Sequence, residues 1–269
     1  MTAHANRLTP ILEAVRVRAR ERRRLSDSAS LWARVEADPG RRDRFVTALR
    51  QPGLSVIAEI KRRSPSAGAL CDVEDVARRA RRYAAGGAAA ISVLTEGDHF
   101  GGSLGDLEQA GAGGLPRLRK DFLVDEGMIL ESAVHGADAV LLLACCLTAG
   151  ELRRLRQLAG DLGLAVLIEV HTEEELAPAL AAEPEAIGVN ARDLSTLRVA
   201  PGVVERLLPL VPAGFLRVAE SGIATRADLK RVAALGAEAA LVGEALMRTP
   251  DPEATLREWR PADIQVTRT

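Results

Sequence analysis

The stretch that decides the fold runs from residue 139 to residue 171 and reads AVLLLACCLTAGELRRLRQLAGDLGLAVLIEVH. The apolar run Ala139–Leu143 is followed by an amphipathic segment, Ala149–Ala159, and then by a second apolar run, Ala165–Ile168. Strands that are covered on both faces read as continuous apolar runs, and parallel neighbours are usually connected through a helix. The stretch therefore predicts a strand–helix–strand unit of a parallel sheet.

The same alternation extends outward over most of the chain. Apolar runs predict eight strands, at Leu54–Ile60, Ala88–Leu94, Leu115–Arg119, Ala139–Leu143, Ala165–Ile168, Ala186–Val189, Phe215–Ala219 and Ala239–Val242. Helical patterns lie between most of them, at Val73–Ala85, Glu126–His135, Ala149–Ala159, Thr172–Leu180 and Arg226–Leu235. Eight strand–helix units in about 220 residues predict an α/β fold of the (β/α)₈ TIM-barrel type. A doubly wound open sheet is the alternative, but the glycine-rich segment Gly101–Gly105 lacks the GxGxxG spacing of such a sheet.

Residues 1–50 precede the first predicted strand and read as a basic, helical extension. They hold 12 arginines against 6 acidic residues, and Leu8, Ile11, Leu12 and Val15 recur at helical spacing. Because acidic residues are interspersed among the arginines, a solvated helix face is favoured over an anion-binding arm. With 269 residues, we expect a single barrel domain with this extension at its N-terminus.

The composition excludes several classes of protein. Apolar residues make up 47% and charged residues 27%, and the net charge of −1 argues against general nucleic-acid binding. The longest apolar run, Ala139–Leu147, is nine residues, whereas a membrane-spanning helix needs about 20. There is no signal-peptide pattern at the N-terminus, and three cysteines make no disulfide framework. We therefore expect a cytoplasmic protein without membrane or nucleic-acid partners.

Lysine is rare in the chain, and its positions are informative. Only Lys61, Lys120 and Lys230 accompany 33 arginines. Arginine stays protonated at any working pH, whereas a buried lysine can exchange a proton. Lys61 and Lys120 both follow predicted strands, at the end of a barrel where catalytic residues gather.

Other polar residues end the predicted strands in the same way. They are Glu59, Glu169, His171, Asn190, Arg192 and Glu220. The strand period of two places Glu59 with Lys61 on one face, and Glu169 with His171 on another. Lysine and glutamate in one pocket can act as acid and base, and a Schiff-base lysine is the main alternative. The four histidines are far apart in sequence, so no metal is expected, and Cys145–Cys146 are expected to be packing residues.

Two late loops predict recognition of a phosphate. Barrels often bind phosphate through backbone N–H groups in the loops after the seventh and eighth strands. Here those loops are Glu220–Ile223 and Val242–Ala245, and both contain glycine. The first loop, Lys61–Gly68, adds cations and hydroxyl groups. The predicted partner is a phosphorylated small molecule.

These segments, taken in order, are similar to a known family. The matching stretches are Ile57–Ser66, Ser92–Glu96 with Phe100–Ser103, Leu118–Phe122, Gly136–Asp138, Leu167–His171, Asn190–Leu194, Glu220–Ile223 and Leu241–Met247. From about residue 8 to residue 258 the chain resembles the indole-3-glycerol phosphate synthases of tryptophan biosynthesis. The resemblance implies a lyase that closes the ring of 1-(2-carboxyphenylamino)-1-deoxyribulose 5-phosphate and releases CO₂ and water. It also implies that residues 1–50 lie over the barrel mouth.

The resemblance further implies roles for the strand-end residues. Lys120 is the general acid, Lys61 holds the substrate carboxylate, and Glu169 takes part in dehydration. Glu59 positions Lys61 or acts as its proton partner. The other implied site residues are Asn190, Arg192 and Glu220 near the substrate hydroxyls, Ser64, Ser221, Gly222 and Gly243 near the phosphate, and Phe100 and Phe122 beside the anthranilate ring. No cofactor is implied, and another enzyme of the tryptophan pathway stays open as a partner.

Some features depart from the family pattern and keep alternatives open. Ala191 follows Asn190 where a second asparagine is common, and Cys145–Cys146 is unusual after the fourth strand. A related enzyme for a substituted anthranilate and a catalytically silent binding barrel are the alternatives. The reaction of phosphoribosylanthranilate isomerase needs a cysteine and an aspartate at strand ends as base and acid. The Glu59–Lys61 ending of the first strand counts against it.

Overall fold

The computed structural model describes residues 8–25, 28–35, 38, 40–64, 68–69, 75–200 and 202–267. Within these residues, eight parallel strands form a closed barrel in the order β1-β10-β9-β8-β7-β6-β5-β4. Its strands are β1 (Ser55–Ile60), β4 (Ala90–Leu94), β5 (Arg117–Lys120), β6 (Ala139–Leu143), β7 (Ala165–Val170), β8 (Ala186–Asn190), β9 (Leu216–Glu220) and β10 (Ala239–Val242). The predicted (β/α)₈ barrel is therefore confirmed.

Closure of the barrel depends on β1, which pairs with both β10 and β4. Ser55 lies opposite Ala239 in the first pair, and Ile57 lies opposite Ala90 in the second. Every residue of β1, β6 and β7 is buried, as continuous apolar runs predict. All eight predicted strands occur.

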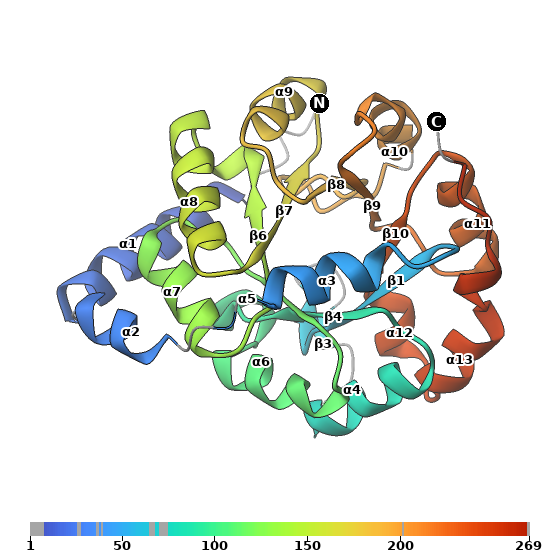
Figure 1. The fold of residues 1–269 in the computed structure, drawn as a ribbon, viewed down its shortest axis with the longest axis horizontal. Coiled ribbons are helices and arrows are strands. Elements are labelled where there is room, and N and C mark those ends of the chain that lie inside the picture. Colours follow the sequence, from blue (N-terminus) through green and yellow to red (C-terminus); the bar gives the residue numbers. More distant parts are fainter. Residues whose placement is uncertain are drawn as a thin grey trace.

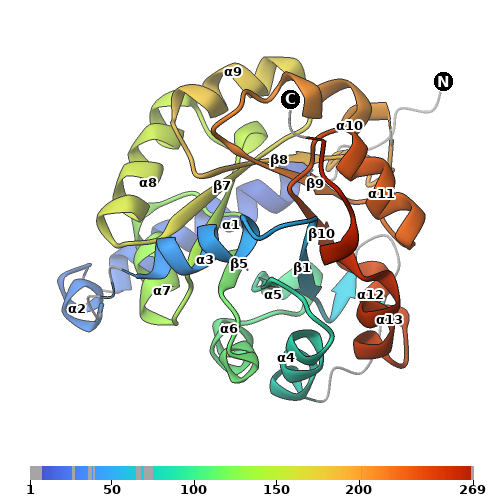
Figure 2. The ribbon, with the colours of Figure 1, turned by 45° about the vertical axis from the view of Figure 1, so that its right-hand side comes forward.

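Helices form the outer layer around the strands (Figures 1 and 2). They are α4 (Val76–Ala85), α6 (Leu104–Ala110), α7 (Glu126–Val134), α8 (Ala149–Asp161), α9 (Glu173–Ala181), α10 (Gly202–Leu207), α11 (Arg226–Ala234) and α13 (Pro252–Trp259). Several begin at a capping side chain, such as Thr148 before α8 and Thr225 before α11, where the hydroxyl accepts an N–H from the first turn. The predicted helices therefore occur, with ends shifted by a few residues.

Short strands, helices and 3₁₀ turns lie at the two ends of the barrel. They are β2 (Arg63–Ser64) paired with β3 (Gly68–Ala69), the helices α5 (Gly97–Phe100) and α12 (Glu244–Arg248), and the 3₁₀ turns η1 (Gly111–Gly113), η2 (Ala144–Cys146), η3 (Leu208–Leu210) and η4 (Pro261–Asp263). The strand pattern does not predict them because they are too short to show a period. α5, η2 and α12 follow β4, β6 and β10, and so lie at the C-terminal ends of the strands.

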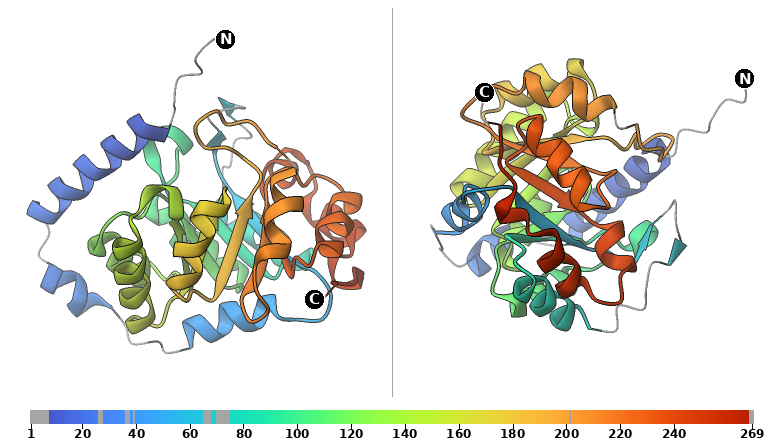
Figure 3. Two further views of the ribbon diagram at one scale, coloured as in Figure 1. Left: turned by 90° about the horizontal axis from the view of Figure 1, so that it is seen from above. Right: turned by 90° about the vertical axis from the view of Figure 1, so that its right-hand side faces the viewer.

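The N-terminal extension is divided between the two ends of the barrel. It holds α1 (Leu8–Leu25), α2 (Ser28–Arg34) and α3 (Arg41–Leu49). Arg16 of α1 donates to the carbonyl oxygen of Cys146, which follows β6, so α1 lies on the mouth side. Arg42 of α3 donates its backbone N–H to Gly163, which precedes β7, so α3 lies at the opposite end. Figure 3 shows the two helices on opposite sides of the strands, whereas the whole extension was expected over the mouth.

No helix of the described residues has the length and apolar character that a membrane span requires.

Candidate active site

A cavity of about 460 Å³ opens at the C-terminal ends of the barrel strands. It is lined by twelve of the predicted site residues, namely Glu59, Lys61, Phe100, Lys120, Phe122, Glu169, Asn190, Arg192, Glu220, Ser221, Gly222 and Gly243. Ser64, the remaining one, lies in β2, and its side chain falls outside the described part of the structure. The structure thus brings together groups that are up to 184 positions apart in the sequence, Glu59 and Gly243.

Lys120 occupies the centre of a buried cluster of charges. Its Nζ lies 2.6 Å from Glu169 Oε2 and 3.2 Å from Glu220 Oε2. Both carboxylates are almost completely buried, on β7 and β9. Asn190 Nδ2 donates to the other oxygen of Glu169 at 2.8 Å and fixes its orientation. A lysine between two carboxylates in a cavity is a set of groups that can exchange protons with a bound molecule.

The charges in this cluster bias one another. Burial alone would lower the pKa of Lys120, but the two carboxylates outweigh burial and raise that pKa above its ordinary value. Burial would raise the pKa of Glu169, yet Lys120 and His171 hold it well below the usual range. For Glu220, burial and the charge of Glu169 prevail over Lys120 and raise the pKa to about 8. At neutral pH the cluster therefore holds an ammonium group, a carboxylate and a protonated carboxyl.

Lys61 and Glu59 form a second, simpler pair across the cavity. Lys61 Nζ lies 2.7 Å from Glu59 Oε1, and both side chains are largely buried. The strand period predicted that these two residues share a face. This pair leaves Lys61 with a single carboxylate partner among the described salt bridges, in contrast to the two around Lys120.

Two glycines make room for the glutamates. A Cβ at position 188 on β8 would come within 2.2 Å of Glu220 Oε1. A Cβ at position 243 would come within 2.1 Å of Glu59 Oε1 and 2.9 Å of Lys61 Nζ. The observed positions of both carboxylates therefore depend on glycine, because the end of each glutamate side chain would have to move away from a Cβ. Gly243 was predicted to lie near the phosphate. The structure adds that its lack of a side chain leaves space for Glu59 and Lys61.

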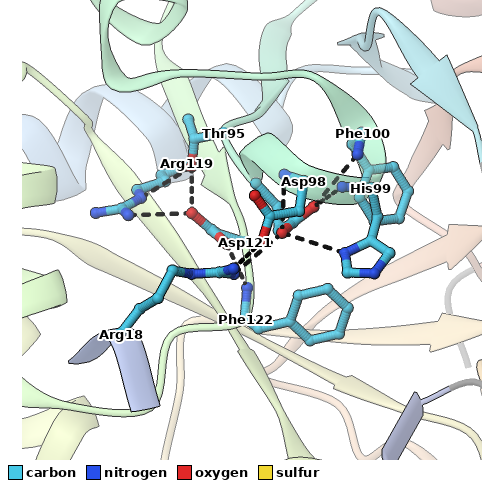
Figure 4. Close-up of polar contacts among 9 residues, drawn as sticks. Arg18, Thr95, Asp98, His99, Phe100, Arg119, Asp121 and Phe122 are labelled. Atoms are coloured by element: carbon cyan, nitrogen blue, oxygen red, sulfur yellow. Dashed lines mark hydrogen bonds and ion pairs between the residues drawn. The ribbon is translucent and has the colours of Figure 1, made fainter. Parts of the chain in front are cut away.

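A buried network joins the C-terminal ends of β4 and β5, and Figure 4 shows its members Thr95, Arg119 and Asp121. Arg119 Nε donates to Thr95 Oγ1 at 3.1 Å, and Arg119 Nη2 donates to Asp121 Oδ2 at 3.1 Å. Thr95 Oγ1 in turn donates to Asp121 Oδ2 at 2.6 Å, while Asp121 Oδ1 accepts the backbone N–H of Phe122 at 2.8 Å. These bonds hold the end of β5 on both sides of Lys120.

The N-terminal helix α1 reaches the mouth through Arg18. Arg18 pairs with Asp98 and lies 3.2 Å from Glu96 Oε1. Glu96 caps α5, since its Oε2 accepts the N–H groups of His99 at 2.8 Å and Phe100 at 3.3 Å. Figure 4 shows Arg18 extending toward Asp98, beside the turn that carries His99 and Phe100. α1 therefore contacts the segment that places Phe100 in the cavity.

The loops after β9 and β10 line the end of the cavity where the sequence predicts phosphate binding. Ser221 and Gly222 both adopt left-handed backbone angles, with φ of 65° and 69°. This conformation is costly for serine, and such strain is concentrated at functional sites. Arg192 lies close by and donates to the carbonyl oxygen of Leu197 at 2.9 Å. Arg248, which sequence reasoning missed, also lines this end and pairs with Glu244 at 2.9 Å.

Most of the remaining cavity wall is apolar, although Asp121 also lines it. The large apolar side chains are Leu94, Leu141, Leu143, Leu194, Leu197, Val199, Ile223 and Leu241, together with Phe100 and Phe122. The strand period could have found Leu141 and Leu143, which are two positions apart on β6 and face the same way. Arg248 carries no such signal because it lies at the end of a five-residue helix. An apolar wall beside a charged cluster suits a ligand with one flat apolar part and one ionised part.

His171 lies beside the cluster but is not part of the cavity wall. Its Nε2 is 3.2 Å from Glu169 Oε1, and its Nδ1 is 3.2 Å from Glu175 Oε2. Burial would lower the pKa of His171, but its contacts with Cys145 and the two glutamates raise it to about 12. A hydrogen bond from Cys146 and the neighbouring imidazolium lower the pKa of the Cys145 thiol to about 6, against the effect of burial.

This geometry defines a class of protein. A closed parallel barrel whose strand ends bring lysines and buried carboxylates into one cavity has the architecture of a (β/α)₈-barrel enzyme. The family model for indole-3-glycerol phosphate synthase matches residues 8–259. The chain belongs to the indole-3-glycerol phosphate synthase family.

Individual relatives agree with this assignment. Indole-3-glycerol phosphate synthase of Mycobacteroides abscessus is 45% identical over 252 residues, covering 93% of this chain and 92% of the relative. The enzyme of Parafrankia sp. is 48% identical over 248 residues, covering 92% of each chain. That of Micrococcus luteus is 44% identical over 264 residues, covering 96% of this chain and 98% of the relative.

Solved structures with lower identity share the fold alone. Tryptophan synthase from M. tuberculosis matches with a TM-score of 0.60 at 16% identity, over 83% of this chain and 97% of that chain. Thiamine phosphate pyrophosphorylase from Pyrococcus furiosus matches with a TM-score of 0.58 at 16% identity, over 78% of this chain and 95% of that chain.

Proposed function

We propose that the chain converts 1-(2-carboxyphenylamino)-1-deoxyribulose 5-phosphate into indole-3-glycerol phosphate. The observation that carries the proposal is the position of Lys120 Nζ, held between Glu169 and Glu220 in a cavity that also holds Lys61. Family membership over residues 8–259 supports the same reaction. The substrate equals the product plus one CO₂ and one water, so no oxidant or reductant is needed.

The first step is ring closure. The aromatic carbon that bears the carboxylate attacks the carbonyl carbon of the sugar chain, and a C–C bond forms while the C=O bond becomes C–O. Lys120 gives a proton to the carbonyl oxygen as negative charge develops on it. Before the substrate binds, Lys120 is in its protonated ammonium form, because the neighbouring carboxylates raise its pKa. A positioned general acid contributes about 10²–10⁴-fold to a rate.

Lys61 is proposed to bind the substrate carboxylate before it leaves as CO₂. The pairing of Lys61 Nζ with Glu59 Oε1 at 2.7 Å holds the ammonium at the cavity wall. Loss of CO₂ leaves its electron pair in the ring, which restores aromaticity. The apolar side chains of Phe100 and Phe122 then flank a ring that no longer carries charge.

Dehydration completes the indole. The hydroxyl formed in the first step takes a proton from the Lys61 ammonium and leaves as water, and a proton departs from the adjacent carbon. Glu169 is an ionised carboxylate that can take up this proton, since its pKa is held low. Glu220 is protonated at neutral pH and can hydrogen-bond to a substrate hydroxyl. Asn190 keeps Glu169 in place through its 2.8 Å hydrogen bond.

The phosphate is proposed to bind at the loops after β9 and β10. Backbone N–H groups of Ser221, Gly222 and Gly243 can approach an anion closely because two of the three residues lack a side chain. Arg192 and Arg248 supply positive charge at this end, opposed by Glu244. Arg192 and Asn190, which also line the cavity, are proposed to contact the substrate hydroxyls.

The test is turnover of the full chain without added metal or nucleotide. Purified protein is mixed with the carboxyphenylamino-deoxyribulose phosphate, and indole fluorescence and released CO₂ are measured together. One CO₂ per indole product is expected. No product, with the compound still raising the thermal midpoint, would contradict the proposal and indicate a binding barrel. Turnover of ring-substituted derivatives alone would indicate a substituted-anthranilate enzyme.

A further inference from the structure

A second cluster of reactive side chains lies outside the cavity. Cys145 of η2, His171 after β7 and Glu175 of α9 each offer a ligand atom, and the three atoms lie within 4.8 Å of one another. None of the three lines the cavity. All three side chains are partly exposed, so an ion could reach them from solvent.

The donor set favours a transition-metal ion such as Zn²⁺. A thiolate, an imidazole and a carboxylate are the groups that bind Zn²⁺, and three protein ligands leave a fourth tetrahedral position for water. Magnesium and calcium prefer sets of oxygen ligands, which this cluster does not offer. The sequence hides the set because Cys145 is 26 positions from His171 and meets it only through the pairing of β6 with β7.

The surroundings of His171 supply an independent argument. A histidine that binds metal through one ring nitrogen almost always donates its other N–H to a carboxylate. Nδ1 faces Glu175 Oε2 at 3.2 Å, while Nε2 lies 3.2 Å from Glu169 Oε1. Nε2 is buried and lacks a well-formed hydrogen bond among the described residues. Binding through Nδ1 would therefore leave Nε2 placed to donate to Glu169.

We propose that Cys145, His171 and Glu175 form a binding site for one Zn²⁺ ion, coupled to the active site through Glu169. The metal would replace the contact between His171 Nδ1 and Glu175 Oε2. It would hold the imidazole in the form that donates from Nε2. Because Glu169 Oε2 lies 2.6 Å from Lys120 Nζ, the ion is linked to the proposed general acid through two side chains. A donating Nε2 would compete with Asn190 for Glu169 Oε1, so zinc is expected to lower turnover, and this part alone rests on the proposed function.

Direct binding measurements test the site without any need for activity. The chelator-treated full chain is titrated with Zn²⁺ by calorimetry, and with Co²⁺, whose bond to a thiolate gives a charge-transfer absorption band. We expect one ion per chain in the micromolar range or tighter, with the band present. Cys145→Ala is expected to abolish the band, and His171→Ala and Glu175→Gln are expected to weaken binding by about tenfold or more.

The other two cysteines provide matched controls. Cys146 is buried and its Sγ lies 3.5 Å from that of Cys145, but it is not part of the cluster. Cys146→Ala and Cys71→Ala are expected to bind both ions like the unmodified chain. The proposal is overturned if the unmodified chain binds no zinc at micromolar concentration. It is also overturned if Cys145→Ala and His171→Ala bind as tightly as the unmodified chain.

The coupling has its own readout. Turnover of the unmodified chain is expected to fall as zinc occupancy rises, and turnover of Cys145→Ala is expected to stay constant. Stoichiometric zinc binding with unchanged turnover would contradict the coupling through Glu169. An inactive chain would contradict the proposed function and would leave the binding result to decide the metal site by itself.

Discussion

The two ends of the barrel use the same residue types for different purposes. At the N-terminal end, acidic residues that precede strands accept the backbone N–H of a neighbouring strand. Asp138 Oδ2 accepts from Arg117 at 2.9 Å, Glu185 Oε2 from Val166 at 2.7 Å, and Glu238 Oε2 from Arg217 at 3.3 Å. At the C-terminal end, Glu169 and Glu220 instead face Lys120 and a cavity.

The difference lies in how completely each carboxylate is satisfied. Asp138 also accepts two hydrogen bonds from Arg44, at 3.0 and 2.7 Å, so both of its oxygens have fixed donors. Glu220 Oε1 is buried without a hydrogen-bond partner among the described residues. A buried polar atom without a partner costs free energy, and it persists where a ligand uses it. At the N-terminal end the carboxylate of Asp138 is used completely to hold the strands together, whereas at the C-terminal end Glu220 keeps one oxygen that a bound molecule can use.

Removing the ammonium group of Lys120, at the C-terminal end of the barrel, should have the largest effect. Lys120→Ala is expected to lower kcat by about 10³-fold or more because the general acid is lost. Steady-state assays of indole formation measure it. Lys230→Ala, on the outer helix α11, is the matched control and should retain the unmodified rate. Equal losses in both variants would remove the distinction between the mouth and the rest of the barrel.

The opposite end should respond in stability and not in rate. Asp138→Ala removes the acceptor of three hydrogen bonds and leaves the Arg117 N–H without one. The free energy of unfolding is expected to fall by about 3 kcal/mol, with kcat within about twofold of the unmodified value. Urea unfolding and the indole assay measure the two quantities. Asp161→Ala, at the exposed end of α8, should change neither. A large loss of kcat in folded Asp138→Ala would show that the N-terminal end of the barrel also affects catalysis.

The space that Gly188 of β8 leaves for Glu220 can be filled by one methyl group. Gly188→Ala places a Cβ within 2.2 Å of Glu220 Oε1, so the carboxyl must move away from Lys120. We expect kcat/KM to fall by about 100-fold, since small displacements in a catalytic site cost about this much. Gly150→Ala on α8, where no atom lies within 4 Å of the new Cβ, serves as the control. Unchanged kcat/KM in Gly188→Ala would mean that the position of Glu220 is unimportant.

The raised pKa of Glu220 predicts how stability depends on pH. Below its ordinary pKa of 4.5, this carboxyl is protonated in both the folded and the unfolded chain. Between 4.5 and about 8 only the folded chain keeps the proton, so the free energy of unfolding falls as pH rises. Relative to Glu220→Gln, the unmodified chain should lose about 1 kcal/mol per pH unit in this window. Denaturation at several pH values checks it, and parallel curves for the two proteins would contradict it.

The smallest effect is expected where the N-terminal helix touches the mouth. Arg18→Ala removes the contacts with Glu96 and Asp98 near Phe100. Because the arginine is partly exposed, its ion pairs contribute only about 0–1 kcal/mol. We expect KM to rise about two- to fivefold with kcat nearly unchanged. A loss of kcat similar to that of Lys120→Ala would show that α1 belongs to the catalytic machinery.

Much of the fold and of the cavity wall could be predicted because the patterns that indicate them lie within short stretches of the sequence. Continuous apolar runs identify the eight strands, and the polar residues that end several of these runs identify the mouth of the barrel. Three strands end at the polar residue itself, at Lys120, Asn190 and Glu220.

What the sequence hides depends on contacts between distant segments. The requirement for glycine at positions 188 and 243 comes from glutamates on neighbouring strands. The division of the extension between both ends depends on partners such as Cys146 and Gly163, which no local pattern reveals. The Cys145–His171–Glu175 cluster is likewise produced by strand pairing.

If Lys120 is the general acid of ring closure, it acts before CO₂ is lost. The most direct test is a single-turnover experiment on Lys120→Ala with substrate labelled in the carboxyl carbon, stopped at short times. We predict neither labelled CO₂ nor indole on the time scale of the unmodified chain, because the ring cannot close without the acid. Release of labelled CO₂ at the unmodified rate would contradict this role for Lys120.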